Sequence, residues 1–145
     1  MAKIGILTCS NTTQEMSCSS APCLRDMRER KGAFACYSKD EPLDLTGIIN
    51  CAGCPTLAGY DKLLNRVRAL AEFDVDAIHL TYCIDVLCPF KAKYVSLLEE
   101  HFPDIRIVVG THEPKAAPEQ FREKVKKVLC QPRQIMADIT KGRVK

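Results

Sequence analysis

Short apolar runs alternate with longer segments of helical periodicity along most of the chain. The runs end in small or polar residues, whereas in the longer segments apolar side chains recur every three or four positions. This alternation predicts an α/β protein in which helices cover both faces of a mostly parallel sheet. Five strands are expected, at Lys3–Cys9, Ala33–Tyr37, Leu43–Asn50, Ala77–Tyr82 and Ile105–Val109.

Helices are expected between these strands and after the last one. The first begins near Pro22 and ends at Gly32, because proline is tolerated in a first helical turn and glycine commonly terminates a helix. The others are expected at Tyr60–Phe73, at Lys91–His101 and from Pro118 onward. The run Ile105–Val109 is apolar apart from Arg106 and is expected to be a strand covered on both faces.

For five such units the natural strand order is 2-1-3-4-5, that of a single flavodoxin- or Rossmann-like domain. We assign residues 1–130 to this domain and residues 131–145 to a tail with little pattern. In this order the third strand lies between the first and the fourth. The carboxyl ends of the strands meet at one edge, and the switch point between the first and third strands is where open α/β sheets bind ligands.

Composition narrows the class of protein without naming a function. The 145 residues are 46% apolar and 27% charged, as in an ordinary soluble domain. The net charge of +3 is small and its basic residues are scattered, so no nucleic-acid partner is expected. Neither a signal peptide nor a run of ~20 apolar residues is visible, so we expect a cytoplasmic protein without a membrane partner.

Seven of the nine cysteines lie at or near the expected strand ends. Cys9, Cys51 and Cys83 follow the first, third and fourth strands, so strands ~4.8 Å apart would place them in a row. In a reducing compartment such a pattern indicates metal ligation or catalysis before disulfides. The other four of this set are Cys18, Cys23, Cys54 and Cys88.

The spacing of the cysteines indicates which metal they bind. Cys51-Ala52-Gly53-Cys54-Pro55 is a C-x-x-C motif followed by proline, and Cys88-Pro89 repeats the Cys-Pro pair, as in ferredoxin-type sites. Zinc would use four ligands and leave three of the seven cysteines without a role. This surplus favours one or more iron–sulfur clusters, with a role in electron transfer, sensing or delivery of metal or cluster, and a redox partner protein in the first case.

Other interpretations stay open. The cysteines are also compatible with a zinc-binding structural or regulatory module, or with a dithiol oxidoreductase that uses Cys51 and Cys54. The hydroxyl-rich segment Thr8–Thr13 is a weak candidate for phosphate binding, as in a flavin or nucleotide site. Whether the protein catalyses a reaction, for example with the metal as a Lewis acid, is not determined by these patterns.

The three histidines differ in their expected roles. His112 follows the fifth strand on the same edge as the cysteines, where it would bind metal or hydrogen-bond a bound sulfur. His79 lies within the fourth strand and is expected to be a hydrogen-bonded core residue, and His101 at a helix end has no assigned function. Two cysteines are set aside: Cys36 as a small core residue of the second strand, and Cys130 as remote from the edge.

At these residues the chain resembles the CGGC-domain family, small α/β proteins named for a central Cys-Gly-Gly-Cys. The resemblance runs from about Lys3 to His112 and includes the C-x-x-C motif, although Ala52 stands where the family motif has its first glycine. It implies metal binding through cysteines and histidines and supplies no reaction. The metal ligands predicted here are Cys9, Cys18, Cys23, Cys51, Cys54, Cys83, Cys88 and His112.

Overall fold

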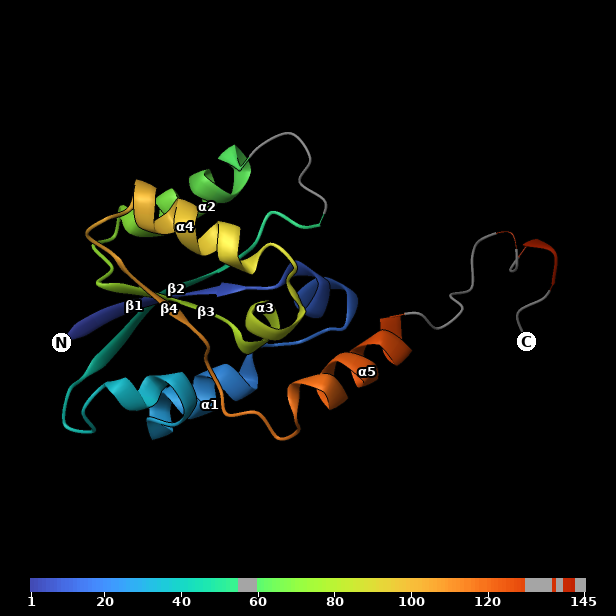
Figure 1. Cartoon of the computed structure of the whole chain (residues 1–145), viewed down its shortest axis with the longest axis horizontal. Helices are drawn as coiled ribbons and strands as arrows, with labels where there is room; N and C mark the ends of the chain where they lie inside the picture. Colours follow the sequence, from blue (N-terminus) through green and yellow to red (C-terminus); the bar gives the residue numbers. More distant parts are fainter. Residues whose placement is uncertain (55–59, 130–136, 138–139, 143–145) are drawn as a thin grey trace.

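A parallel sheet flanked by helices forms the body of the protein (Figure 1). A computed structural model describes residues 1–54, 60–129, 137 and 140–142. Within these residues the sheet has four strands in the order β2-β1-β3-β4, all parallel. The strands are β1 (Ala2–Thr8), β2 (Leu43–Asn50), β3 (Ala77–Leu80) and β4 (Arg106–Val109).

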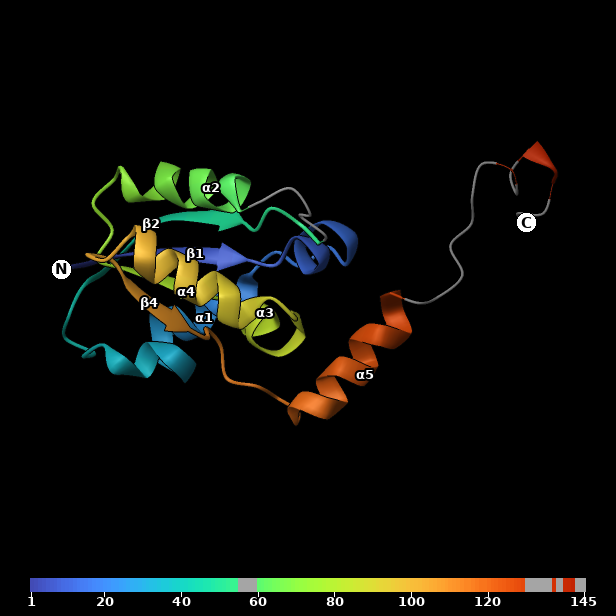
Figure 2. The same ribbon diagram turned by 45° about the horizontal axis from the view of Figure 1, so that its top comes forward.

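Helices cover both faces of the sheet, as the alternation predicts. Helices α2 (Asp61–Ala71) and α4 (Lys91–His101) lie over one face and α1 (Ala21–Glu29) over the other (Figures 1 and 2). Alternate residues of β1 therefore enter different cores, with Leu7 beneath α2 and Ile6 beneath α1. Two further helices, α3 (Tyr82–Leu87) and α5 (Pro118–Leu129), lie at the carboxyl end of the strands.

The prediction of a second strand at Ala33–Tyr37 is wrong. Gly32–Cys36 forms a 3₁₀ turn, in which residues three apart face the same way. Phe34 and Tyr37 are three residues apart and both are buried against the sheet. This spacing is that of a 3₁₀ turn, whereas in a strand the buried side chains would be two residues apart. Cys36, expected in the core, is exposed. The sheet therefore has four strands within the described residues instead of five.

The predicted strand order also needs correction. Leu43–Asn50 was expected between the first strand and Ala77–Tyr82, but β1 itself lies between β2 and β3. The local sequence pattern does not show which strands lie side by side, because strand pairing depends on how the connecting helices pack. The chain adds β2 on one side of β1, and β3 and β4 on the other side. The switch point of this strand order therefore lies between β1 and β3, and open α/β sheets bind ligands at such a point.

Strand β4 is not covered on both faces as its apolar run suggests. It is the last strand in the order and pairs with β3 along Ala77–Leu80. Its residues are only partly buried, and Val109 is 39% exposed. This run, apolar apart from Arg106, therefore forms an edge strand within the described sheet.

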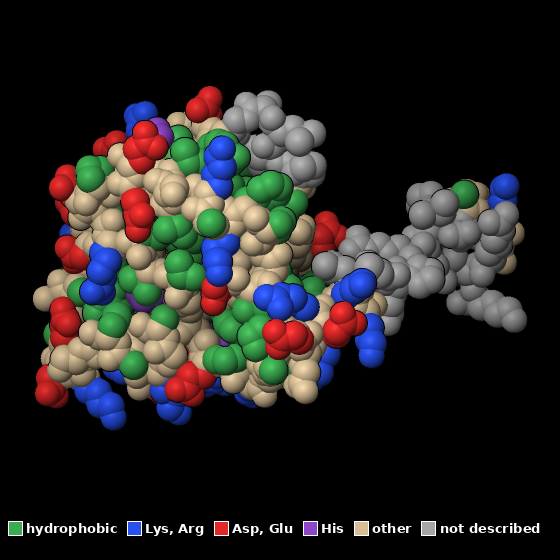
Figure 3. All heavy atoms as spheres, viewed as in Figure 1, with side chains coloured by type: hydrophobic (Ala, Val, Ile, Leu, Met, Phe, Trp, Pro, Cys, Tyr) green, Lys and Arg blue, Asp and Glu red, His purple; other side chains and the backbone are tan. Residues whose placement is uncertain are grey.

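The tail and the surface complete the description. Cys130 and most of the expected tail lie outside the described residues. None of the described helices is long and apolar enough to cross a membrane. On the face drawn in Figure 3, basic and acidic side chains are interspersed.

Candidate metal centre

Cys9 lies between Cys51 and Cys83 at the carboxyl end of the sheet. The N–H of Cys51 donates to the carbonyl of Thr8 over 2.8 Å, and the N–H of Thr81 donates to that of Leu7 over 3.0 Å. These bonds continue the pairing of β1 past the ends of β2 and β3. The predicted convergence of the three strand ends is therefore present, with Cys9 in the middle because β1 is the central strand.

Four cysteines surround one cavity of about 350 Å³, which we call the four-cysteine cavity. Cys9 comes from the end of β1, the pair Cys51 and Cys54 from the segment after β2, and Cys88 from the end of α3. Leu87, Tyr94 and Val125 add apolar side chains to the wall of this cavity. The set differs from a simple row of strand ends because the helix α3 brings Cys88 back to the cavity.

The remaining predicted ligands surround a second cavity of about 290 Å³, which we call the histidine cavity. Cys18 and Cys23 reach it from the segment around the start of α1, Cys83 from the first turn of α3, and His112 from the loop after β4. Thr12 and Val125 line both cavities, so the two adjoin each other. The eight predicted residues thus separate into two groups of four.

Amide donors point at the sulfurs of the C-x-x-C motif. The backbone N–H of Ser10 lies 3.4 Å from Sγ of Cys51, and the side-chain Nδ2 of Asn11 lies 3.8 Å from Sγ of Cys54. Such donors stabilise a sulfur that carries negative charge. Asn11 begins a π-helical turn, Asn11–Glu15, and Ser10 precedes its first residue.

The Cys9 thiol, with two hydroxyl groups, makes Cys83 the most acidic of the thiols whose pKa is shifted. A hydrogen bond from the Cys9 thiol, reinforced by the hydroxyls of Thr12 and Thr81, lowers the pKa of Cys83 to about 5 against the opposing effect of burial. The oxygens of Thr12 and Thr81 lie 3.3 and 2.9 Å from its sulfur. The same contact and burial raise the pKa of Cys9, so the pair shares one proton near neutral pH.

In two other thiols burial is the largest influence on the pKa. It raises the pKa of Cys23 and that of Cys88 above the ordinary value, although the Thr111 hydroxyl, 3.2 Å from Sγ of Cys23, favours the thiolate. A metal must displace these protons, so its binding releases them and strengthens as the pH rises.

The C-x-x-C motif accommodates its alanine without backbone strain. Gly53 has φ +95°, a conformation that side chains disfavour, whereas Ala52 is not among the residues with positive φ. The glycine that the motif requires is therefore the second one, which this chain retains. Cys51 is buried and Cys54 exposed. Pro55, which completes the Cys-Pro pair, lies outside the described residues.

His79 is the core residue that its strand position predicts. Its Nδ1 donates to the carbonyl of Gly110 over 3.1 Å, which leaves Nε2 to accept from the hydroxyl of Tyr37 over 2.9 Å. Phe34 stacks on the ring at 4.4 Å. Burial lowers the pKa of His79 to about 4, so the ring is neutral and both of its nitrogens are engaged.

The donor set fits a thiophilic metal in chemistry and number. Four thiol sulfurs around one cavity match the ligands of a zinc ion or an iron–sulfur cluster. Within the described ranges, however, no three Cys, His, Asp or Glu residues are already positioned to hold one metal ion. Binding therefore requires side chains to rotate toward the cavity. Arg122 and Lys126 of α5 also line it and supply positive charge beside the sulfurs.

Sequence reasoning missed the hydroxyl and cationic residues of the site. Thr8, Thr81 and Thr111 lie at or just after the ends of three strands, and this repetition was the available signal. The hydroxyls of Ser10 and Thr13 donate to the carbonyls of Cys51 and Cys9, and the hydroxyl of Thr12 lies 3.3 Å from the sulfur of Cys83. The hydroxyl groups of this segment therefore contact the cysteine segments. Arg122 and Lys126 carried no signal, because only the fold brings α5 to the sulfurs.

The fold and the site define a small α/β protein with a cysteine-rich edge. The model of the CGGC domain matches residues 3–112, and the chain belongs to this cysteine-rich family, for which metal binding has been proposed. Helix α5 lies beyond the matched residues. No curated protein and no solved structure matches the chain.

Proposed function

We propose that the protein binds metal through the thiolates of the four-cysteine cavity, and that the centre is an iron–sulfur cluster. The observation that carries this proposal is the meeting of Cys9, Cys51, Cys54 and Cys88 around one cavity. An iron–sulfur cluster takes four cysteine ligands. Its chemistry would be one-electron transfer, sensing of oxidants or metal, or delivery of the cluster to another protein.

Two features favour a cluster over a single zinc ion. The cavity of about 350 Å³ is much larger than the ~30 Å³ that one water molecule occupies, so it has room for several atoms. The donors on Cys51 and Cys54 are also of the kind that tunes cluster potentials, since hydrogen bonds to the sulfurs stabilise added negative charge. A zinc-binding module is the second candidate, because four thiolates also suit zinc.

The structure offers less support for a dithiol oxidoreductase at Cys51 and Cys54. In such enzymes a helix begins at the motif and favours the thiolate of the attacking cysteine. Here the next helix within the described residues, α2, begins at Asp61. A reducing compartment such as the cytoplasm keeps the thiols free for metal, which agrees with this proposal.

The test compares metal content among cysteine variants prepared without oxygen. Cys54→Ser and Cys88→Ser each remove one donor of the four-cysteine cavity, whereas Cys36→Ser removes an exposed cysteine outside it. We expect iron and sulfide to be lost from the first two and retained in Cys36→Ser at the wild-type level. Equal iron in all four proteins would reject the site, and zinc in place of iron in the wild type would select the second candidate.

A further inference from the structure

Cys9 and Cys83 are hydrogen-bonded to each other through their sulfur atoms. They come from neighbouring chain segments, because the N–H of Thr81 donates to the carbonyl of Leu7 and each cysteine lies two residues further along. Neighbouring strands are ~4.8 Å apart, within the ~4.4–6.8 Å between Cα atoms that a disulfide spans. Rotation of the two side chains can therefore bring the sulfurs to bonding distance.

We propose that Cys83 and Cys9 form a dithiol that reacts with hydroperoxides. The peroxide oxidises Cys83, and Cys9 then closes a disulfide with it. This reaction goes beyond the metal site proposed above and takes place in the metal-free protein. Cys9 cannot bind metal and form a disulfide at the same time, so the two chemistries belong to different states of the same chain.

Cys83 is the thiol of this pair that a peroxide can reach. It is partly exposed and lines the histidine cavity of about 290 Å³. This volume is large beside the ~30 Å³ that one water molecule occupies, so a hydroperoxide group fits in it. Cys9 is only 7% exposed and lines the adjoining four-cysteine cavity instead. The first oxidation therefore falls on Cys83, with Cys9 behind it as the second thiol.

Two threonine hydroxyl groups lie beside the sulfur of Cys83. Oγ1 of Thr81 lies 2.9 Å from it and Oγ1 of Thr12 lies 3.3 Å from it. Both threonines also line the histidine cavity, so their hydroxyls can hydrogen-bond a peroxide next to the sulfur. A donor at this place stabilises the negative charge that develops on the leaving oxygen. The two threonines therefore form the binding site for the peroxide group.

The reaction proceeds in two steps. The sulfur of Cys83 attacks one peroxide oxygen, so that an S–O bond forms and the O–O bond breaks. The leaving oxygen takes the proton that the Cys83 thiol has released and departs as an alcohol, or as water from hydrogen peroxide. The sulfur of Cys9 then attacks the sulfenic acid, an S–S bond forms, and the hydroxyl group leaves as water with the Cys9 proton. The two sulfurs lose two electrons, which reduce the peroxide.

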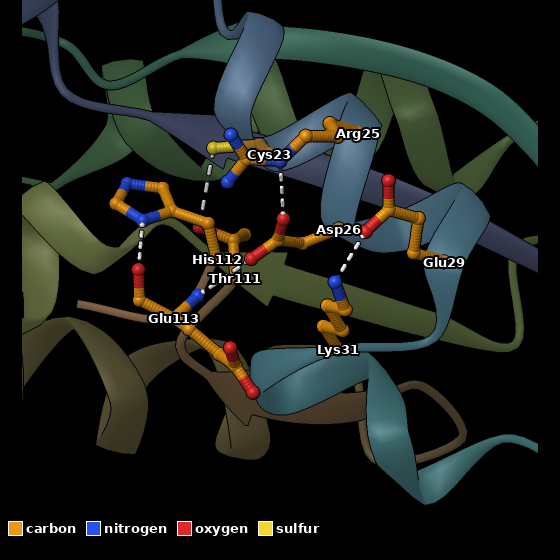
Figure 4. Close-up of polar contacts among 8 residues, drawn as sticks. All are labelled: Cys23, Arg25, Asp26, Glu29, Lys31, Thr111, His112 and Glu113. Carbon is orange, nitrogen blue, oxygen red and sulfur yellow. Dashed lines mark hydrogen bonds and ion pairs between the residues drawn. The ribbon is translucent and has the colours of Figure 1, made fainter. Parts of the chain in front are cut away.

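Cys23 also lines the histidine cavity, but its sulfur has a different partner (Figure 4). Sγ of Cys23 lies 3.2 Å from Oγ1 of Thr111, and this oxygen accepts the N–H of Tyr82 over 3.1 Å. Because the oxygen already accepts, its hydroxyl proton is available for the sulfur. Cys23 is thus engaged with Thr111, whereas Cys9 is in hydrogen-bonding contact with Cys83. The contacts therefore select Cys9 as the thiol that closes the disulfide.

The test treats reduced, metal-free, full-length protein with hydrogen peroxide, blocks the remaining thiols and maps the disulfides by mass spectrometry. We expect the loss of two thiols per chain and a linked Cys9–Cys83 peptide, both reversed by dithiothreitol. Cys9→Ser should lose the linked peptide, and dimedone should instead trap the sulfenic acid of Cys83. Cys36→Ser removes an exposed cysteine that lines neither cavity and should behave as the wild type. Circular dichroism checks that each variant is folded.

The peptide map of the wild type decides the outcome even if Cys9→Ser does not fold. A disulfide between another pair, such as Cys51–Cys54 or Cys23–Cys83, with Cys9 unchanged, would overturn the proposal. Oxidation of Cys83 no faster than that of Cys36 would overturn it as well. Failure of the iron–sulfur proposal would not alter the map, since the test contains no metal, and an unreactive Cys83 would not alter the iron content.

Discussion

The hydroxyl oxygen of Thr81 lies 2.9 Å from the sulfur of Cys83. Together with the Cys9 thiol and the hydroxyl of Thr12, it holds the pKa of Cys83 at about 5, while burial raises the pKa of Cys88 in the same helical segment. Both cysteines are partly exposed, so they form a matched pair that differs mainly in acidity.

This pair predicts different pH profiles of alkylation in the metal-free, reduced protein. The thiolate is the reactive species, so the rate at Cys83 should be nearly constant between pH 6 and 8. At Cys88 the thiolate fraction is still small, and the rate should rise about tenfold per pH unit. Mass spectrometry after brief exposure to iodoacetamide measures both. A tenfold rise per unit at Cys83 would show that its thiol is not acidic.

The C-x-x-C motif predicts opposite tolerance at its two central residues. Gly53→Ala places a side chain at φ +95° and should destabilise the fold by about 1–3 kcal/mol, with weaker metal binding. Ala52→Gly restores the family motif and should change stability by less than about 1 kcal/mol. Urea unfolding and metal content of the two variants test this. Equal effects of the two changes would contradict the backbone argument.

The cationic residues of α5 should strengthen metal binding at the four-cysteine cavity. Four thiolates around a divalent ion carry a net charge of about −2, and Arg122 and Lys126 line the same cavity. Replacing both by glutamine should weaken Co²⁺ binding about tenfold at low salt, corresponding to ~1.4 kcal/mol, and by less at high salt.

Lys127→Gln is the control for this change, because Lys127 is on the same helix and does not line the cavity. Its affinity should match that of the wild type at every salt concentration. A loss of equal size in the control would mean that only the overall charge of α5 matters.

His79 predicts a loss of stability in mild acid. Its folded-state pKa of about 4 lies below the ordinary value of 6.5. Its contribution is therefore complete above pH 6.5, and it decreases toward pH 4 because the unfolded chain binds a proton that the folded core excludes. The decrease is up to about 3 kcal/mol.

The measurement is the free energy of unfolding of metal-free protein at pH 7, 5.5 and 4.5. His79→Gln should be less stable at pH 7 and should lose less stability on acidification than the wild type does. His101→Gln, which alters an exposed histidine, should follow the wild type. Parallel pH profiles for wild type and His79→Gln would contradict the assignment of this effect to His79.

The success of sequence-based prediction varied with how local the relevant interactions are. Leu43–Asn50 and Lys91–His101 form their predicted elements with the same bounds, and the prolines Pro42 and Pro103 lie just outside them. The segment Ala33–Tyr37 is short, and two buried rings with a spacing of three outweigh its alternation. The pairing of β1 with both β2 and β3 depends on crossovers, which no local pattern encodes.

The candidate site shows the same division. The position of Cys9, Cys51 and Cys83 at strand ends was sufficient to expect their convergence. The local sequence pattern could not predict that the eight residues separate into two cavities. This separation depends on the position of Cys88 at the end of α3 and on the packing of α5 beside the cysteines. The acidity of Cys83 arises from Cys9, Thr12 and Thr81, which are brought together only by the folded strand ends.

The account is tested most directly by the iron, sulfide and zinc content of the wild-type protein purified without oxygen. We expect brown protein with iron and sulfide in equal amounts, about four of each per chain for a four-iron cluster. Colourless protein that contains neither iron nor sulfide after anoxic preparation and reconstitution would contradict the iron–sulfur centre.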